Sequence, residues 1–194
     1  MAWLSNKQLR AMGFARLGNN PQLSDRAVFH NCANIRLGDN VRIDDFCVLS
    51  AGAAGITVGS YVHIAVYSSL IGAGHIELAD FSNISSRVSI YSSNDDYSGS
   101  FMTNPTVPSE FTLVQHESVS VGRHVIVGSG SVILPGVTLE EGVAIGALSL
   151  VKFSCRAFGI YAGVPVRLIA ERKMDLLRLE KQLIEQNMRL SRSC

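Results

Sequence analysis

The feature that most constrains the fold of this chain is a six-residue repeat in residues 121–155. An aliphatic side chain fills all six positions spaced by this period: Val121, Val127, Ile133, Leu139, Ile145 and Val151. A second series, four residues further along, holds small or β-branched residues: Val125, Ser131, Val137, Val143, Ser149 and Cys155. A period of six is neither the 3.6 of a helix nor the 2 of a single strand. It is typical of a parallel β-helix, in which each hexad forms a short strand and a tight turn, and three hexads close one coil.

The same repeat extends towards the N-terminus, with interruptions between coils. Three triplets continue the pattern: Leu37, Ile43 and Leu49; Val58, Ile64 and Leu70; Leu78, Ile84 and Ile90. They begin 21 and then 20 residues apart rather than 18, so we expect short insertions at one corner, near residues 53–55 and 72–77. The period is absent from residues 92–118 and resumes in phase at Val121. We therefore predict one long excursion from the column in this segment.

The N-terminal segment, residues 1–22, leads into the repeat. Ser5 and Gln8 have the spacing of a helix capping box, so a short helix is expected there. Residues 23–165 then form the expected β-helix domain, and its irregular first coil has Val28 as an inward candidate. With 47% hydrophobic residues the chain can bury one core, and we expect a single, mainly β domain with small terminal additions.

The C-terminal segment, residues 166–194, predicts a charged helix. Its leucines at positions 176, 179, 183 and 190 fall near heptad spacing, so we expect it to lie against the column or to pair across subunits. The formal net charge of +1 offers no basic surface for nucleic acid. The sequence contains no run of about 18 apolar residues and no leader-like start, so we expect a cytoplasmic protein without a membrane span.

Three further stretches resemble a known family. Residues 127–138 (VGSGSVILPGVT), 145–147 (IGA) and 162–169 (AGVPVRLI), together with the repeat, are similar to the hexapeptide-repeat acyltransferases. The resemblance covers about residues 28–172. It implies a left-handed β-helix, which is an exception to the right-handed crossover rule. It also implies a homotrimer that binds acetyl-CoA in the cleft between two adjacent columns.

Within this family the chain most resembles enzymes that acetylate sugars of bacterial surface polysaccharides. Residues 42–47 (RIDDFC) and 85–91 (SSRVSIY) carry this narrower resemblance. It implies transfer of an acetyl group to the amino group of a nucleotide-linked sugar, as in dTDP-4-amino-4,6-dideoxyglucose-type N-acetyltransferases. Sugar O-acetyltransferases, which use a hydroxyl acceptor, are the second interpretation.

Two alternatives of other classes stay open on the same fold. One is a zinc lyase resembling the γ-carbonic anhydrases, which needs three converging histidines. The histidines of this chain do not have the spacing of that family, so we expect no metal: His63, His75, His116 and His124. The other alternative is a non-catalytic trimeric scaffold.

Acyl transfer requires a base near the attacking group. Many sugar acetyltransferases of this family carry a histidine just after the third-coil strand, where this chain has an asparagine and the carboxylates of Asp95 and Asp96. His63 directly precedes the inward Ile64, should point outward, and matches a His-Ile pair of amino-sugar N-acetyltransferases. The resemblance therefore makes His63 a catalytic candidate. Asp95 and Asp96 are the other two catalytic candidates. A plain turn in which neither carboxylate reacts is the alternative.

The resemblance also implies binding residues. For the acyl donor, where small side chains allow close approach and cations meet phosphates, it indicates four positions: Ser129, Ala147, Lys152 and Arg167. For the acceptor it indicates three: Arg87, Asn94 and Tyr97. Ordinary solvated surface charge is the alternative for the two cations of the donor set.

Overall fold

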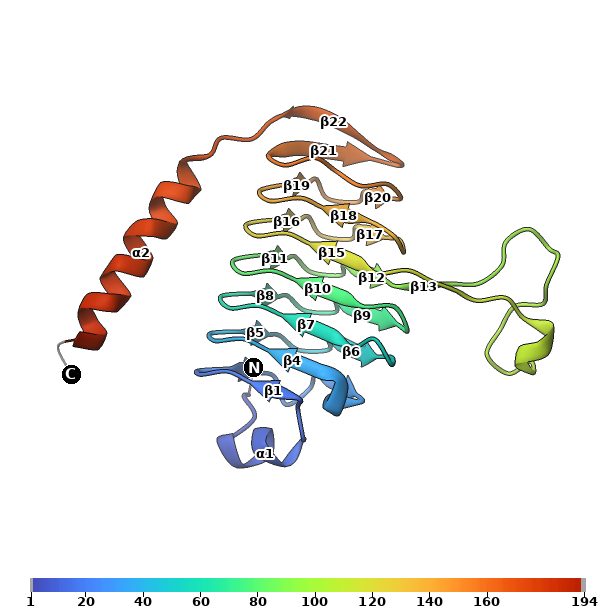
Figure 1. Cartoon of the computed structure of the whole chain (residues 1–194), viewed down its shortest axis with the longest axis horizontal. Helices are drawn as coiled ribbons and strands as arrows, with labels where there is room; N and C mark the ends of the chain where they lie inside the picture. The colour runs from blue at the N-terminus through green and yellow to red at the C-terminus, as the bar shows by residue number, and fades with distance from the viewer. Residues whose placement is uncertain (1, 193–194) are drawn as a thin grey trace.

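In the computed structural model the chain forms a three-sided column of stacked coils, a left-handed parallel β-helix (Figure 1). The structure describes residues 2–192, and side chains as far as Met188. Residues 193 and 194, at the end of the expected C-terminal segment, and the side chain of Leu190 lie outside the described part. Each side of the column is one sheet, and each coil contributes a strand to every sheet it reaches.

The three sheets are called the first, second and third face, in the order in which the chain visits them. The first face contains β1 (Arg16–Leu17), β4 (Ile35–Leu37), β7 (Ile56–Val58), β10 (Ile76–Leu78), β15 (Val119–Val121) and β18 (Thr138–Leu139). The second face contains β2 (Gln22–Leu23), β5 (Arg42–Ile43), β8 (His63–Ile64), β11 (Asn83–Ile84), β16 (Ile126–Val127), β19 (Ala144–Ile145), β21 (Gly159–Gly163) and β22 (Val166–Glu171). The third face contains β3 (Val28–His30), β6 (Val48–Ala51), β9 (Ser69–Gly72), β12 (Ser89–Tyr91), β17 (Val132–Ile133) and β20 (Leu150–Val151).

The chain turns at three edges, which follow the first, second and third face respectively. At the first two edges the turning residue has a positive φ, as at Tyr61 (58°) and Tyr67 (63°). This left-handed backbone favours glycine and asparagine. Aromatic residues occupy several of these positions, and their rings stack on the next coil. The edges therefore carry stacked side chains as well as turns.

The six-residue repeat is confirmed as the core of the column. All six aliphatic residues of the series that starts at Val121 are buried, and so are the six small residues that begin at Val125. Burying an aliphatic side chain of this size stabilises a fold by about 1.5–3 kcal/mol. The hexads thus explain both the shape of the column and most of its stability.

The first coil corrects one expectation. Val28 was expected to point inward, but its side chain is 44% exposed. Phe29 instead pairs with the buried Leu49 and packs against the core. Counting six residues from the buried Leu23 leads to Phe29, so an aromatic ring fills a position where the pattern favoured an aliphatic side chain. The column also begins earlier than residue 23, because β1 already pairs with β4.

The ends of the chain cap the column. The helix α1 (Asn6–Ala11) has the expected capping box, and η1 (Cys32–Asn34) is a short 3-10 turn at the third edge. The C-terminal helix α2 (Asp175–Arg192) begins nine residues later than expected. The residues before it form β22, which pairs antiparallel with β21 and so covers the last open strand of the second face.

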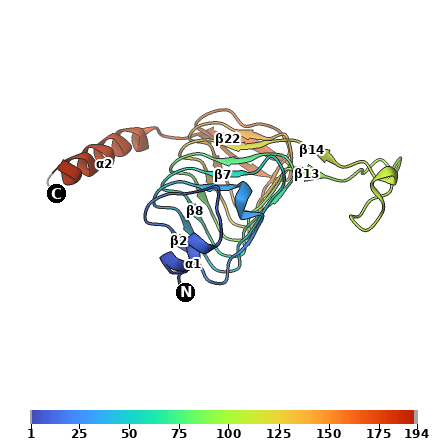
Figure 2. The same ribbon diagram turned by 60° about the horizontal axis from the view of Figure 1, so that its bottom comes forward.

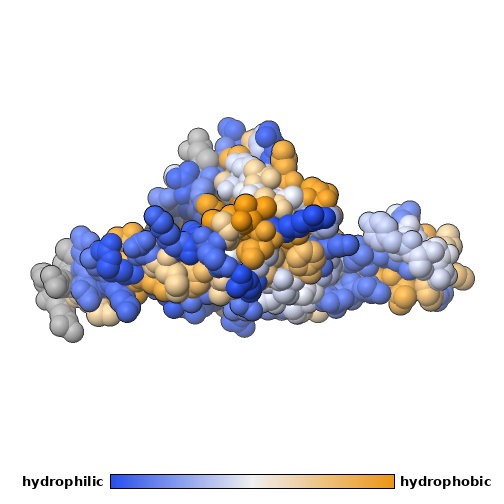
Figure 3. Space-filling view, turned by 90° about the horizontal axis from the view of Figure 1, so that it is seen from above, coloured by the Kyte–Doolittle hydropathy of each residue, from blue (hydrophilic) through white to orange (hydrophobic). Residues whose placement is uncertain are grey.

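The predicted excursion is confirmed. It leaves at the third edge as a ribbon of β13 (Ser93–Asn94) and β14 (Gln115–His116), and its far part holds η2 (Ser109–Phe111). Figures 2 and 3 show this arm and α2 on opposite sides of the column. Exposed apolar side chains of the arm include Phe101, Met102, Phe111, Leu113 and Val114. Among the helices of residues 2–192, none combines the length and apolarity that crossing a membrane requires.

Candidate functional site

A hollow of about 400 Å³ lies at the root of the excursion. Tyr91, Val132 and Leu134 contribute its wall from the third face and the turn that follows it. The excursion contributes the remaining lining residues: Ser93, Asn94, Asp95 and Tyr97. The structure therefore brings together three residues that the sequence indicated, Asn94, Asp95 and Tyr97. A concave surface that combines apolar walls with a few polar groups is typical of a ligand site.

The ribbon that carries this hollow is fixed to the column by Ser93. Its Oγ accepts the backbone N–H of Ala73 at 2.8 Å and lies 2.8 Å from Nδ1 of His116 on the opposite strand. Because Ser93 and His116 are directly paired, the bond closes the ribbon at the point where it leaves the column. The sequence did not indicate this pair, because its members are 23 positions apart in a segment without the repeat.

The two aspartates of the excursion have different surroundings. The carboxylate of Asp96 accepts the hydroxyl of Ser98 and the backbone N–H groups of Ser98, Gly99 and Phe101. The Ser98 hydroxyl and these N–H groups lower the pKa of Asp96. The side chain of Asp95 makes no hydrogen bond or ion pair within the described residues, and it lines the hollow. The geometry therefore favours Asp95 as the group that meets a ligand, and Asp96 as a support of the loop.

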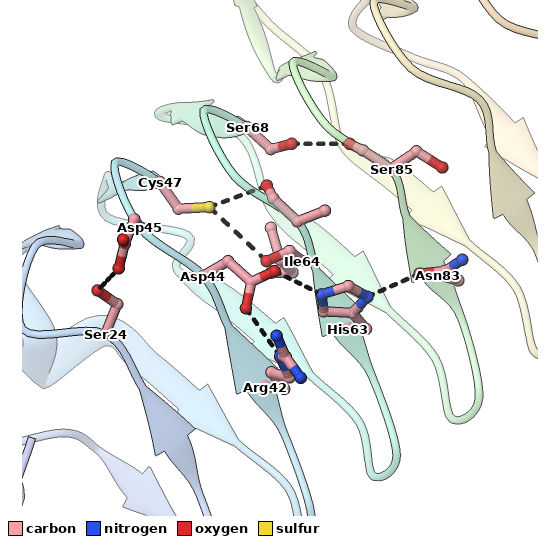
Figure 4. Close-up of polar contacts among 11 residues, drawn as sticks. Ser24, Arg42, Asp44, Asp45, Cys47, His63, Ile64, Ser68, Asn83 and Ser85 are labelled. Atoms are coloured by element: carbon pink, nitrogen blue, oxygen red, sulfur yellow. Dashed lines mark hydrogen bonds and ion pairs between the residues drawn. The ribbon is translucent and has the colours of Figure 1, made fainter. Parts of the chain in front are cut away.

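A second polar cluster lies on the second face, where it links three successive coils (Figure 4). Nε of Arg42 donates to Oδ1 of Asp44 at 2.8 Å. Nε2 of His63 lies 2.8 Å from Oδ2 of Asp44, and its Nδ1 lies 3.2 Å from Oδ1 of Asn83. Both ring nitrogens of His63 are thus engaged inside the protomer. In this arrangement neither is free to take a proton from a substrate, so the geometry supports a positioning role.

Asp44 is the centre of this cluster and is 5% exposed. Burial acts to raise the pKa of Asp44, but the hydrogen bonds and charges of Arg42 and His63 outweigh it and hold the pKa below its usual value. The carboxylate therefore stabilises the fold most where it is ionised.

We expect Asp44→Asn to lower the free energy of unfolding at neutral pH by about 1–3 kcal/mol, because the amide replaces a charged acceptor. The pKa of Asp44 is lower in the folded protein than in the unfolded chain, where it is about 3.9. The carboxylate therefore stabilises the fold fully above the unfolded pKa, and this stabilisation is lost as the pH falls through the folded pKa. Urea denaturation between pH 7 and pH 3 should show the gap between wild type and variant closing below about pH 4. The exposed Asp25→Asn is the control, and a gap independent of pH would contradict this account.

The residues expected to hold the acyl donor follow the second edge. Ser129 and Ala147 occupy this edge in successive coils, and the backbone O of Ser129 accepts the N–H of Leu148 at 2.9 Å. Ala162 stacks on Gly146 one coil further and pairs with Arg167 in β22, so Arg167 reaches the same edge. Lys152 instead follows β20 and lies at the third edge. The structure thus groups three of the four expected donor residues.

Arg87 also lies at the second edge. Its backbone has a φ of 59°, and its guanidinium lies 5.7 Å from the ring centroid of Tyr67. The sequence reasoning missed Tyr67 and its stacked neighbour Phe46. Phe46 and Tyr67 are 21 residues apart, and Tyr67 and Arg87 are 20 apart. These steps equal those between the coils, which is the signal that could have found the two aromatic residues.

Within one protomer the two polar regions are separate. Figure 1 shows β8, which carries His63, and the root of the excursion at opposite sides of the column. Asp95 and His63 therefore do not meet in a single copy of the chain. A site that used both would need a second protomer.

Comparisons with known proteins cover nearly the whole chain, although no family model matches it. A dTDP-4-amino-4,6-dideoxy-D-glucose acyltransferase from Escherichia coli is 56% identical over 180 residues, which span 93% of this chain and 94% of the relative. AntD, an N-acyltransferase from Bacillus cereus solved with dTDP and 3-hydroxybutyryl-CoA, is 43% identical with a TM-score of 0.90, covering 95% of this chain and 97% of AntD.

Two other solved structures mark the range of the similarity. An AntD variant with a serine replaced by cysteine, in complex with dTDP-4-amino-4,6-dideoxyglucose and coenzyme A, is 42% identical with a TM-score of 0.90, covering 95% of this chain and 97% of that chain. A maltose O-acetyltransferase from Clostridium difficile 630 is 18% identical with a TM-score of 0.58, covering 87% and 75%, and shares the fold alone. The strong matches span both polar regions and the excursion.

Proposed function

Because this chain belongs to the hexapeptide-repeat acyltransferases, we propose that it transfers an acetyl group from acetyl-CoA to the amino group of a dTDP-linked 4-amino-4,6-dideoxy sugar. The observation that carries the proposal is the 56% identity, over nearly the full length of both chains, to an acyltransferase named for that sugar. The AntD complexes add that a neighbour with the same column accommodates both dTDP and an acyl-CoA.

In the proposed reaction the unprotonated amine attacks the carbonyl carbon of the thioester. The nitrogen becomes positively charged in the tetrahedral intermediate, and the carboxylate of Asp95 takes its surplus proton. The C–S bond then breaks, and the thiolate of CoA leaves and takes a proton from solvent. Asp95 fits this role because it lines the hollow and holds no partner in the described chain. Asn94 and Tyr97, which line the same hollow, contact the acceptor.

We place the acyl donor along the second edge. Ser129 and Ala147 are exposed and small, so the pantetheine chain can approach the backbone closely. Arg167, which pairs with Ala162 at this edge, is placed at the phosphates of the donor, and Lys152 of the third edge serves from a neighbouring copy. No metal takes part in the reaction as written. Within the described residues no three His, Cys, Asp or Glu side chains gather closely enough to hold a metal ion.

We propose that the working form is a homotrimer. Outward residues of the second and third faces are apolar in the last coils, namely Ile126, Ala144, Ile160, Val132 and Leu150. Outward residues of the first face include the exposed charges Arg16, Arg36 and Glu77. Packing the second face of one copy on the third face of another would bury the apolar columns and leave the charged face in water. It would also bring Asp95 of one copy towards the second edge of the next.

We further place the reaction in the cytoplasm, where nucleotide sugars and acetyl-CoA are available, and in the assembly of a bacterial surface polysaccharide. In this proposal the acetylated amino-dideoxy sugar is a building block of such a polymer. The narrower resemblance of residues 42–47 and 85–91 supports this setting.

A panel of acceptors tests the proposed reaction. Purified protein is incubated with acetyl-CoA and either dTDP-4-amino-4,6-dideoxyglucose or its 4-hydroxy counterpart, and thiol release is followed. We expect thiol release with the amino sugar only. Asp95 can accept a proton from the positively charged nitrogen of the intermediate, but a carboxylate is too weak a base to deprotonate a neutral hydroxyl. Release with the hydroxy sugar alone would support the O-acetyltransferase interpretation. Absence of release with either would reject both.

A further inference from the structure

Four side chains form a continuous row along the second edge: Arg26, Phe46, Tyr67 and Arg87. The rings of Phe46 and Tyr67 are stacked, with centroids 4.9 Å apart and planes at 18°. The guanidinium of Arg26 lies 5.9 Å from the Phe46 centroid, and that of Arg87 lies 5.7 Å from the Tyr67 centroid. We call this set the arginine–aromatic row. It presents two ring edges between two positive charges.

The row has a counterpart at the first edge, which shows what such a stack can do. There Tyr61, Phe81 and His124 are stacked at 5.0 and 5.1 Å. Helix α2 lies against that stack: Asn187 donates to the Tyr61 hydroxyl at 2.9 Å, and Glu180 lies 2.8 Å from Nε2 of His124. The first-edge stack therefore binds a segment of the chain itself.

Among the described residues, no helix lies against the arginine–aromatic row as α2 lies against the first-edge stack. Phe46 is 43% and Tyr67 is 53% exposed, although both have the left-handed backbone that large side chains avoid. Within the described residues, the side chain of Arg87 makes no hydrogen bond or ion pair. Arg26 approaches the carboxylate of Asp45 only to 3.9 Å. Exposed rings on a strained backbone, next to a guanidinium that makes no hydrogen bond or ion pair within the described residues, indicate a site for a ligand outside the chain.

The position of the row suggests which ligand it takes. It continues the edge on which Ser129 and Ala147 lie, directly below the proposed path of the acyl donor. From Arg87 to Phe46 the row spans two coil spacings, roughly 10 Å at about 4.8 Å per coil. A ligand that extends from the thioester along this edge would first present its sugar, then two phosphates and last a nucleoside. The charge of Arg87 and the rings beyond it are in the matching order.

We propose that the arginine–aromatic row binds the nucleoside diphosphate of the acceptor. The diphosphate is bound by Arg87, whose planar guanidinium is held in place by Tyr67 and suits paired phosphate oxygens. The deoxyribose and the base lie along the exposed ring edges of Tyr67 and Phe46, a geometry that aromatic rings favour. This inference rests on the proposed function for the identity of the nucleotide, but the binding itself can be measured without turnover.

The test is calorimetric titration of the protein with dTDP alone, in wild type and in Arg87→Gln. We expect the Kd for dTDP to rise about 10-fold or more, because a charge-assisted contact is lost. Arg36→Gln is the matched control, since Arg36 is an exposed arginine of the first face. Arg26→Gln at the other end of the row should give a smaller rise in this Kd.

Steady-state kinetics separate the two possible sources of the phosphates. For Arg87→Gln we expect a higher KM for the dTDP-sugar and an unchanged KM for acetyl-CoA. A rise in the KM for acetyl-CoA alone would mean that the row binds the phosphates of CoA, and would overturn the proposal. So would an unchanged Kd for dTDP in a folded Arg87→Gln variant. If Arg87→Gln weakened dTDP binding but the wild-type protein did not acetylate the amino sugar, the proposed nucleotide site would be supported and the proposed reaction would be rejected.

Discussion

Replacing Asp95 by asparagine is expected to lower kcat for acyl transfer by about 10²-fold or more, while the melting temperature stays near that of wild type. Asp95 lines the hollow at the root of the excursion, and its side chain makes no hydrogen bond or ion pair with the described residues. Asparagine keeps the shape of the side chain but cannot accept a proton from the nitrogen of the intermediate. Single-turnover measurements of acetyl transfer, together with thermal unfolding, test both halves of this expectation.

Asp96→Asn is the matched control for this experiment. Asp96 uses its carboxylate for the hydroxyl of Ser98 and three backbone N–H groups of the loop. Its replacement should therefore act on loop order, with a smaller loss of kcat than Asp95→Asn. If Asp96→Asn lost activity and Asp95→Asn kept it, the roles assigned to the two carboxylates would be reversed. If neither lost activity, His63 would return as the candidate.

Gly74→Ala is expected to destabilise the protein by about 1–3 kcal/mol and to lower activity at the same time. A Cβ at Gly74 would lie 2.6 Å from the backbone O of Glu117 and 2.8 Å from the backbone O of Ser92. These two residues are the ends of the excursion where it leaves and rejoins the column. Because the clashing atoms belong to the backbone, no rotamer change can relieve them. The ribbon would have to shift, and Asp95 would shift with it.

Gly99→Ala provides the comparison. Gly99 lies in the same excursion and has a φ of 83°, but a Cβ there meets nothing within 4 Å. Gly99→Ala should lower the free energy of unfolding by about 1 kcal/mol, which is the strain of an alanine in the left-handed conformation, and should have little effect on kcat. Denaturant unfolding and kcat measured on both variants separate the two effects. Equal losses of activity in both would show that loop strain, rather than displacement of the ribbon, is responsible.

The arrangement of the site explains why assembly matters to the proposed function. Both ring nitrogens of His63 are hydrogen-bonded to Asp44 and Asn83 on the second face. The carboxylate of Asp95, at the third edge, has no hydrogen-bond partner among the described residues. The proposed donor path and the arginine–aromatic row run along the second edge. One protomer therefore carries the proposed binding surface and the proposed base in separate places. Contact between copies would join them, with the exposed apolar side chains of the excursion covering the neighbour.

The six-residue repeat allowed the architecture to be predicted from the sequence. Burial in this fold depends on short-range order: each strand contributes one inward side chain, and the next follows six residues later. Val121 and its successors therefore identify the column without any knowledge of distant contacts. The same rule located the excursion, because the repeat stops at its start and resumes in phase at its end. It failed at Val28, where a one-residue difference reverses the face that a side chain occupies.

The tertiary structure alone decided how neighbouring polar groups share their partners. Asp95 and Asp96 are equivalent in sequence, and only the turn that closes over Asp96 leaves Asp95 available. Phe46 and Tyr67 meet because insertions at the third edge keep successive coils in register across 21 residues. The sequence by itself thus determined which side chains are buried, since that depends on local periodicity. Which exposed groups meet one another depends on contacts between coils, and local periodicity does not encode those.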